Sequence, residues 1–148
     1  MTVAGSPELL PEPVAAPLPA DEALAHLRGA RRRLAAQALD ERTVYYRVRS
    51  RTVADIGGWL GPRPVDVFAT DRGLTLVSAG RFDFEGRDPL VEHVPYDDLD
   101  RSTYNYATGR LALAPAEQCP VKRLSMGPDE AQQLLAQVHR HWGLQPAP

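Results

Sequence analysis

The sequence is poor in cysteine and in long apolar runs, and each shortage excludes a class of protein. Cys119 is the single cysteine among 148 residues, so an internal disulfide framework and cysteine-rich metal sites are excluded. No stretch approaches the roughly 18 apolar residues of a membrane-spanning helix. Residues 1–20 lack a basic segment and are interrupted by prolines, unlike a secretory signal peptide. We therefore expect a cytoplasmic protein.

Overall positive charge is also lacking, because the formal net charge is −2 at pH 7. Binding to nucleic acid through overall charge needs a strongly basic face, so no nucleic-acid partner is expected. Lys122 is the only lysine, and the other basic side chains apart from histidine are arginines. Local groups of arginines are therefore the candidates for binding anions.

Motifs for catalysis and metal binding are absent as well. The chain has no Gly-x-Ser-x-Gly, P-loop, dinucleotide-binding or zinc-protease motif. His139 and His141 lie about 200° apart around the expected final helix and cannot chelate one metal from it alone. Asp97, Asp98 and Asp100 lack the spacing of a calcium loop. The sequence therefore predicts no enzyme, no metal site and no cofactor.

The length of the chain fits one domain with its own core. Residues 1–20 are rich in proline and alanine, which favours a disordered tail. Helix-forming residues run from 21 to 40, with Asp21 placed to cap the N-terminus of the helix. We expect the main domain over 41–143 and a disordered tail over 144–148.

Seven short segments between the two expected helices have strand-like patterns, marked by alternation or by flanking turn residues. The expected strands are 43–51, 65–70, 74–79, 90–94, 99–107, 111–113 and 121–126. Asp71-Arg72-Gly73 predicts a tight hairpin between the second and third strands. Phe82 and Phe84 would extend this hairpin, and residues 52–63 are expected to form a loop.

The last segment has the clearest pattern. Pro128 suits the first helical position, and Gly143 is placed to end the helix. Apolar residues recur at helical spacing along one side: Ala131, Leu134, Leu135, Val138 and Trp142. A helix over 128–142 must therefore cover a core. The predicted fold is mainly β with α: about seven antiparallel strands in two near-orthogonal sheets, capped by this helix, plus an N-terminal helix.

Three segments resemble the bacterial branch of the pleckstrin-homology (PH) family. Residues 67–77 are similar to its Thr-Asp-x-x-Leu hairpin, and residues 91–99 are similar to its Ile-Pro-Tyr-Asp-Asp-Ile segment. Residues 124–142 resemble its last strand and closing helix. The resemblance implies a PH-like barrel, no conserved catalytic machinery and frequent self-association. The proline-rich tail and the first helix lie outside it.

A first candidate site lies on the first strand. Arg47, Arg49 and Arg51 point to one side of that strand and Arg63 follows the next loop, so they could form an anion-binding rim. In lipid-binding PH domains, basic residues at similar places hold phosphates. The plainer interpretation is a solvated face whose arginines pair with carboxylates such as Asp55 or Asp66. A membrane-surface role needs several of these charges acting together.

A second candidate site lies on the first helix. Leu24, Leu27 and Leu34 share one side of it, and Arg31 interrupts the stripe, so these four residues form a candidate peptide or subunit interface. The arginines of the segment are Arg28, Arg31, Arg32 and Arg33. A helix that folds back on the domain or pairs with another subunit explains this pattern. Contact with RNA, anionic lipid or an acidic partner is the alternative.

A third candidate site is aromatic. Tyr104 and Tyr106 share one side of the fifth strand, near the expected groove beside the last helix. Such grooves accept extended peptides by strand addition, and the plainer interpretation is that both rings belong to the barrel wall.

These observations lead to one main hypothesis about function. The chain is expected to be a non-enzymatic PH-like interaction domain that self-associates or docks a protein partner. The alternative is peripheral binding of an anionic membrane or a phosphate-bearing ligand through the arginine rim. An enzyme of unknown type is the third class, because polar groups that converge only in the folded pocket are invisible in a sequence.

Overall fold

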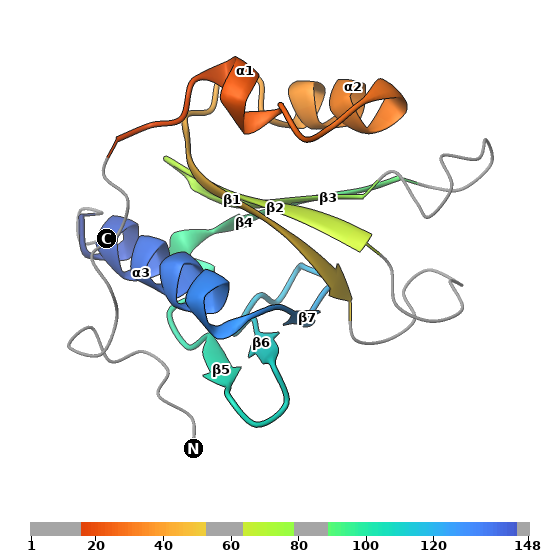
Figure 1. Ribbon diagram of the computed structural model, residues 1–148. Coiled ribbons are helices and arrows are strands. Elements are labelled where there is room, and N and C mark those ends of the chain that lie inside the picture. Colours follow the sequence, from red (N-terminus) through yellow and green to blue (C-terminus); the bar gives the residue numbers. More distant parts are fainter. Residues whose placement is uncertain (1–15, 53–63, 79–88, 145–148) are drawn as a thin grey trace.

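The computed structural model describes residues 16–52, 64–78 and 89–144 (Figure 1). Within these ranges, no helix is both long enough and apolar enough to cross a bilayer. Several predictions lie outside the described residues. They concern residues 1–15, the loop 53–63 with Arg63, the hairpin extension by Phe82 and Phe84, and residues 145–148.

The described strands form one seven-stranded antiparallel sheet in the order β4-β3-β2-β1-β7-β6-β5. Their bounds are β1 (Val44–Thr52), β2 (Pro64–Thr70), β3 (Gly73–Ser78), β4 (Leu90–Pro95), β5 (Thr103–Asn105), β6 (Arg110–Ala112) and β7 (Arg123–Ser125). The predicted number of strands and their antiparallel pairing are confirmed. Among these strands β4 and β5 are free edges, so the sheet is open and the expected closed barrel is not confirmed.

The strand expected over 99–107 is much shorter in the structure. Its first part is a turn that follows the short 3-10 helix η2 (Tyr96–Asp98), and only β5 is extended. The Asn105 side chain accepts hydrogen bonds from the backbone N–H groups of Ala107 and Thr108, at 2.9 and 3.2 Å. These bonds offer the backbone a turn in place of the strand ladder, and the strand ends there.

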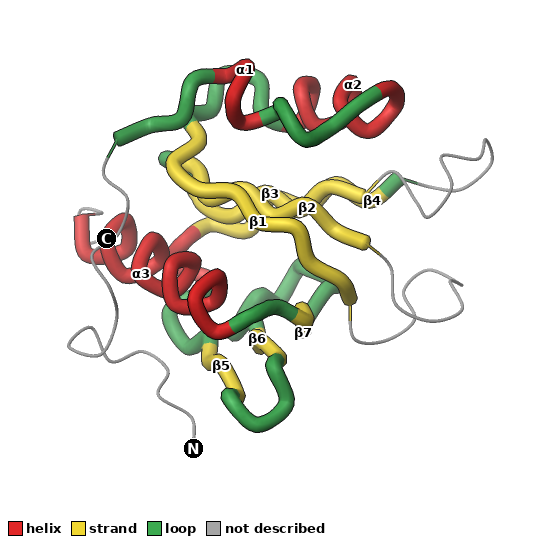
Figure 2. The backbone as a smooth tube through the Cα atoms, in the orientation of Figure 1, coloured by secondary structure: helices red, strands yellow, loops and turns green. Residues whose placement is uncertain are grey.

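Two helices replace the single N-terminal helix expected over 21–40. They are α1 (Ala20–Ala23) and α2 (Gly29–Ala38). Between them Arg28 is extended, and Gly29 has a φ of +58°, a backbone conformation that glycine adopts at little cost. The break lets the chain lie along the sheet. We call residues 18–39 the arm; it covers the face of β1 to β4 opposite α3 (Figure 2).

The C-terminal helix is confirmed as α3 (Pro128–Leu144), but the prediction that Gly143 ends it is wrong, because the helix continues to Leu144. The apolar side chains predicted to face the core are buried: Ala131, Leu134, Leu135 and Val138. The side chain of Trp142, the last member of that stripe, lies outside the described residues. Glu130 accepts a hydrogen bond from the backbone N–H of Gly127 at 3.3 Å, close to the start of the helix. The helix packs on β1, β2 and η2 (Figure 1).

Strands β2 and β3 are buried on both faces of the sheet, and the chain has two apolar clusters. On the inner face, Val67 and Leu76 belong to the main core together with α3. On the outer face, Phe68 and Val77 pack with Leu27 of the arm. This double burial explains why β2 and β3 read as nearly continuous apolar runs rather than as strict alternation.

A bulge in β1 changes which face its first residue occupies. The register against β2 shifts between Val44 and Tyr46. Val44 packs in the outer cluster, whereas Tyr46 and Val48 pack against the main core. In the sequence, Val44, Tyr46 and Val48 alternate with Tyr45, Arg47 and Arg49, which predicts that the first three share one face. This prediction is wrong for Val44, because the extra residue of a bulge reverses the alternation.

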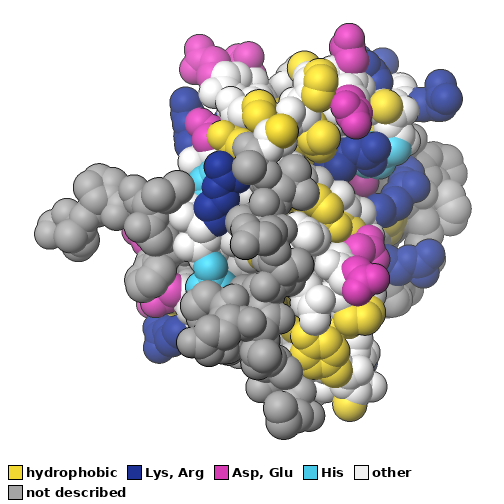
Figure 3. Space-filling view, turned by 60° about the vertical axis from the view of Figure 1, so that its left-hand side comes forward, with side chains coloured by type: hydrophobic (Ala, Val, Ile, Leu, Met, Phe, Trp, Pro, Cys, Tyr) yellow, Lys and Arg dark blue, Asp and Glu magenta, His cyan; other side chains and the backbone are white. Residues whose placement is uncertain are grey.

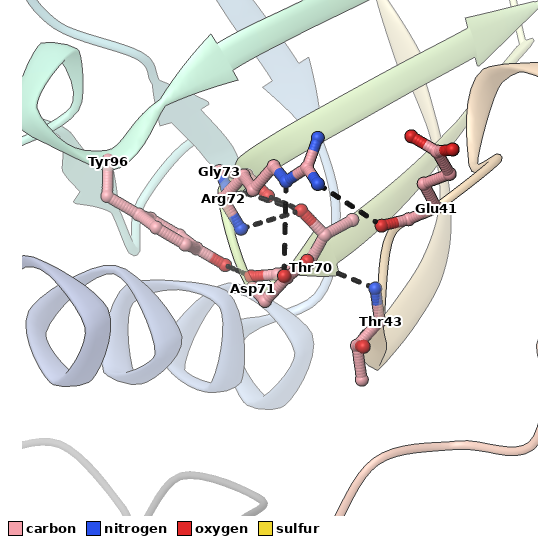
Figure 4. A network of polar contacts seen from close by, with 7 residues as sticks. All are labelled: Glu41, Thr43, Thr70, Asp71, Arg72, Gly73 and Tyr96. Atoms are coloured by element: carbon pink, nitrogen blue, oxygen red, sulfur yellow. Dashed lines mark hydrogen bonds and ion pairs between the residues drawn. The ribbon is translucent and has the colours of Figure 1, made fainter.

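Two of the three segments that resemble PH domains in sequence, residues 67–77 and 91–99, are hydrogen-bonded to each other (Figure 4). The Tyr96 hydroxyl donates to the backbone oxygen of Thr70 at 2.6 Å. The Thr70 hydroxyl accepts from the backbone N–H groups of Arg72 and Gly73, at 3.1 and 3.2 Å. Asp71 accepts from the backbone N–H of Thr43 at 3.0 Å. These side chains therefore hold the β2–β3 turn in place.

Candidate functional site

The arginines of β1 lie on the outer face of the sheet. Arg47 is paired across the ladder with Phe68, and Arg49 with Asp66. Phe68 packs against the arm, so Arg47, Arg49 and Arg51, at alternate positions, share the arm's side of the sheet. Arg49 and Arg51 are exposed, and Arg47 is half-buried. Arg63, the fourth residue of the predicted rim, lies outside the described residues.

The arm places a second set of basic residues beside these strand arginines. A hollow of about 230 Å³ is lined by His26, Leu27, Arg28, Arg31 and Arg49. We call it the arginine pocket. The sequence placed its arginines in two separate candidate sites, and the fold brings members of both together. In Figure 3, basic side chains and a histidine gather below the arm on the right-hand side.

A buried carboxylate supports the pocket from the sheet. The Asp66 side chain is only 9% exposed, and its Oδ1 lies 3.1 Å from Nε2 of His26 and 3.9 Å from Nε of Arg49. A buried charge is tolerated when it is paired in this way. Sequence reasoning singled out neither His26 as a site residue nor its contact with Asp66, because 40 residues separate the two.

The histidine of the pocket is held in its neutral form. Burial is the main cause that lowers the pKa of His26, and the nearby charges of Arg47 and Arg49 act in the same direction. The Asp66 carboxylate opposes this pKa shift without cancelling it. The positive charge of the pocket therefore comes from its arginines.

Helix α2 adds to the positive character of the pocket. It begins at Gly29, between the lining residues Arg28 and Arg31. Its N-cap residue, Arg28, makes no side-chain capping hydrogen bond, and its first turn contains no acidic residue. The first N–H groups of a helix carry a partial positive charge that normally attracts Asp or Glu. This helix start instead lies among arginines.

The leucines predicted at a subunit interface pack within the chain instead. Leu27 is 2% exposed in the outer cluster, and Leu24 and Leu34 are half-buried against the same cluster. Arg32 donates a hydrogen bond to the backbone oxygen of Leu24 at 2.8 Å, across the connection between α1 and α2. Of the two explanations for this segment, the structure favours a helix folded back on its own domain.

The two tyrosines of the aromatic candidate site have different environments. Tyr104 is 2% exposed and donates its hydroxyl to the backbone oxygen of Met126 at 2.8 Å, so it is part of the core wall. Tyr106 is 40% exposed, and its ring packs edge-on against Tyr104 with centroids 4.9 Å apart. Gln132 of α3 donates to the Tyr106 hydroxyl at 2.7 Å. Only Tyr106 is thus available to a partner.

A cleft of about 430 Å³ lies between β4 and the loop that contains Cys119. The side chains of His93 and Asp98 in this cleft make structural hydrogen bonds. His93 shares a hydrogen bond of 2.9 Å with the Thr75 hydroxyl, and burial raises the pKa of the Cys119 thiol, which disfavours the nucleophilic thiolate. Asp98 accepts from the backbone N–H of Glu117 at 3.1 Å. Within the described residues, no group of three or more His, Cys, Asp or Glu is arranged to hold a metal.

Comparison of the chain with protein-family models, with curated proteins and with solved structures finds no match. Among the described residues, the arginine pocket and the exposed Tyr106 are the surface features that favour binding to another molecule.

Proposed function

We propose that this chain is a non-enzymatic interaction domain with a PH-like architecture, and that it binds an anionic group through the outer face of β1. The order of seven strands followed by one amphipathic helix supports the PH-like part. The structural contacts of His93 and Cys119 support the non-enzymatic part. The binding function is carried by one observation: arginines from β1 and from the arm meet at one pocket.

The charge on this face is sufficient for weak, reversible attachment to an anionic surface. Arg47, Arg49 and Arg51 of β1 are joined by Arg28 and Arg31 of the arm. Each basic residue near an anionic leaflet contributes about 1 kcal/mol, so the set supplies roughly 3 to 5 kcal/mol. That range corresponds to dissociation constants around the millimolar level. Because the chain as a whole has a net charge of −2, this attraction is a property of the face.

Flotation with lipid vesicles tests this function. The protein is expected to float with vesicles that contain phosphatidylserine at low salt, and not with phosphatidylcholine alone. Arg49→Glu/Arg51→Glu should abolish flotation, because it reverses two exposed charges of the face. Arg72→Glu/Arg101→Glu makes the same charge change at exposed positions in two turns away from Arg49 and Arg51 and should retain it. Equal loss in both double variants, or no flotation of the wild type, contradicts the proposal.

Tyr106 favours a second function, association with another copy of the chain. It follows β5, which is a free edge of the described sheet. An open antiparallel edge is self-complementary under two-fold symmetry, and the two Tyr106 rings would lie near each other across the axis. Size exclusion with light scattering is expected to detect a dimer that Tyr106→Ala weakens. A strict monomer at high concentration contradicts this second function.

A further inference from the structure

The arginine pocket is composite, because neither the arm nor the sheet forms it alone. His26, Leu27, Arg28 and Arg31 come from the arm, and Arg49 comes from β1. We propose that this pocket binds a single phosphate group, carried by a soluble phosphate ester or by a lipid headgroup, and that binding fastens the arm to the sheet. The inference rests on the proposed anion-binding function and assigns its residues and its ligand chemistry.

The lining has the chemistry of a phosphate site. Three guanidinium groups, those of Arg28, Arg31 and Arg49, border the hollow, and no carboxylate does so among the described residues. A phosphate monoester carries a charge of about −1.5 to −2 at pH 7 and three strong acceptor oxygens. Guanidinium forks bind such groups with two parallel hydrogen bonds. A carboxylate ligand or a single chloride would use only part of this donor set.

The start of α2 follows the lining residue Arg28 directly in the chain and carries further N–H donors. Gly29 and the next residues contribute N–H groups, and the N-cap residue Arg28 makes no side-chain hydrogen bond to them. Arg28 immediately precedes them, and Arg31 lies within the first turn. Helix N-termini bind phosphate through such N–H groups and through the helix dipole. The arginines and the helix start therefore favour the same ligand.

Asp66 positions the pocket without occupying it. Its contact with Nε2 of His26 is a hydrogen bond of 3.1 Å, whereas its distance of 3.9 Å to Nε of Arg49 is longer than a hydrogen bond. The Arg49 guanidinium is thus held near the pocket by charge and can still turn its fork toward a phosphate. The volume of about 230 Å³ is smaller than the roughly 300 Å³ at which pockets begin to hold drug-sized ligands, and it suits one small group.

Fastening of the arm follows from the origin of the lining residues. A phosphate held by Arg28 and Arg49 bridges the arm and β1. Any ligand that binds only the folded state stabilises it by mass action. Phosphate is therefore expected to slow hydrogen exchange of the backbone amides in α2 more than that of amides in α3.

Two matched pairs of variants test the pocket, with inorganic phosphate as the probe in an NMR titration. Arg28→Gln and Arg33→Gln both remove an exposed arginine of the arm, but only Arg28 lines the pocket. Arg49→Gln and Arg51→Gln do the same on β1. Loss of one charge-assisted hydrogen bond should weaken phosphate binding about ten-fold in Arg28→Gln and Arg49→Gln. The two control variants should bind within about two-fold of the wild type.

The pKa of His26, followed in the same titration, gives an independent measurement. Arg47 and Arg49 contribute to lowering this pKa, and a bound phosphate would offset their charge. The pKa of His26 should therefore rise with bound phosphate while Asp66 keeps its contact with Nε2. Phosphate that binds elsewhere on the protein would leave the pKa of His26 unchanged.

Vesicles distinguish the two sources of phosphate. Phosphatidic acid exposes a phosphate monoester, whereas phosphatidylserine at equal surface charge does not. If the wild type prefers phosphatidic acid and Arg28→Gln loses this preference, the arginine pocket binds phosphate and its ligand is a lipid headgroup. If inorganic phosphate binds saturably without such a preference, the pocket binds phosphate and its ligand is a soluble phosphate ester.

Two results overturn the inference. If inorganic phosphate does not bind, or binds all four variants equally, the pocket is not a phosphate site. If phosphate does not bind but vesicle binding still depends on Arg49 and Arg51, the proposed anion-binding function stands and only the phosphate site is refuted. If anionic vesicles are not bound either, both the phosphate site and the proposed function are refuted.

Discussion

Leu27 determines whether the arm belongs to the folded domain. It is 2% exposed and packs with Phe68 of β2 and Val77 of β3. Replacing a buried leucine by alanine removes apolar contacts and leaves a cavity, at a cost of about 2 to 4 kcal/mol. For a chain of this size, 1 kcal/mol lowers the melting temperature by about 2 to 4 °C, so Leu27→Ala should lower it by roughly 4 to 16 °C.

Urea unfolding followed by circular dichroism measures the loss in free energy of unfolding, and two further variants serve as comparisons. Leu24→Ala removes a leucine that is only half-buried in the same cluster, and it should cost about half as much. Val67→Ala creates a cavity in the main core, which the arm does not contact, and it should cost about 1 to 3 kcal/mol whatever the arm does.

Comparison of Leu27→Ala with Val67→Ala shows whether the arm folds cooperatively with the sheet. If Leu27→Ala unfolds within 0.5 kcal/mol of the wild type, on the order of the scatter of surface substitutions, while Val67→Ala is clearly destabilised, the arm does not fold cooperatively with the sheet. The outer cluster would then contribute little to stability. The composite arginine pocket would also lose its structural basis, because four of its lining residues belong to the arm.

Three further predictions concern the rest of the fold. A Cβ at Gly73 would lie 2.1 Å from the backbone oxygen of Val94, so Gly73→Ala should lower the free energy of unfolding by about 2 kcal/mol or more. An unchanged melting temperature would contradict this close approach of Gly73 to β4. Tyr104→Phe loses the buried hydrogen bond to the backbone oxygen of Met126 and should lower the free energy of unfolding by about 1 to 2 kcal/mol. Tyr106→Phe, at an exposed position, should lower it by under about 0.5 kcal/mol. Equal losses would refute the conclusion that Tyr104 is part of the core wall and Tyr106 is not. Burial lowers the pKa of four histidines, which are His26, His93, His139 and His141. The unfolded chain, with histidine pKa values near 6.5, then binds more protons, so stability present above about pH 6.5 should be lost as the pH falls. The urea midpoint should be lower at pH 5.5 than at pH 7.5, and an equal or higher midpoint refutes this.

Features that depend on neighbouring residues were predictable from the sequence. The period of apolar residues and the position of Pro128 identify α3, since helix formation depends on contacts within four residues. Gly143 did not predict the end of the helix, which runs to Leu144. Asp71 and Gly73 likewise identify the β2–β3 turn. Strand lengths were less predictable, because a side chain such as Asn105 can end a strand by a local hydrogen bond that the apolar pattern does not reveal.

The candidate site was predictable only in its residue types. The alternation in β1 correctly places Arg49 and Arg51 on one face, because side chains of a strand alternate regardless of what covers them. The sequence does not reveal which face the arm covers, since this depends on Phe68 and Val77 leaving an apolar outer surface.

The sequence by itself determined the elements of this protein: a run of antiparallel strands, a closing amphipathic helix and an excess of arginine over lysine. Tertiary structure alone decided that the arm lies over the outer face, that Val44 turns toward it, and that Arg28 meets Arg49 beside His26 and Asp66. The physical reason is range. Backbone preferences act over a few residues, whereas burial of apolar surface and pairing of charge join residues far apart in the chain.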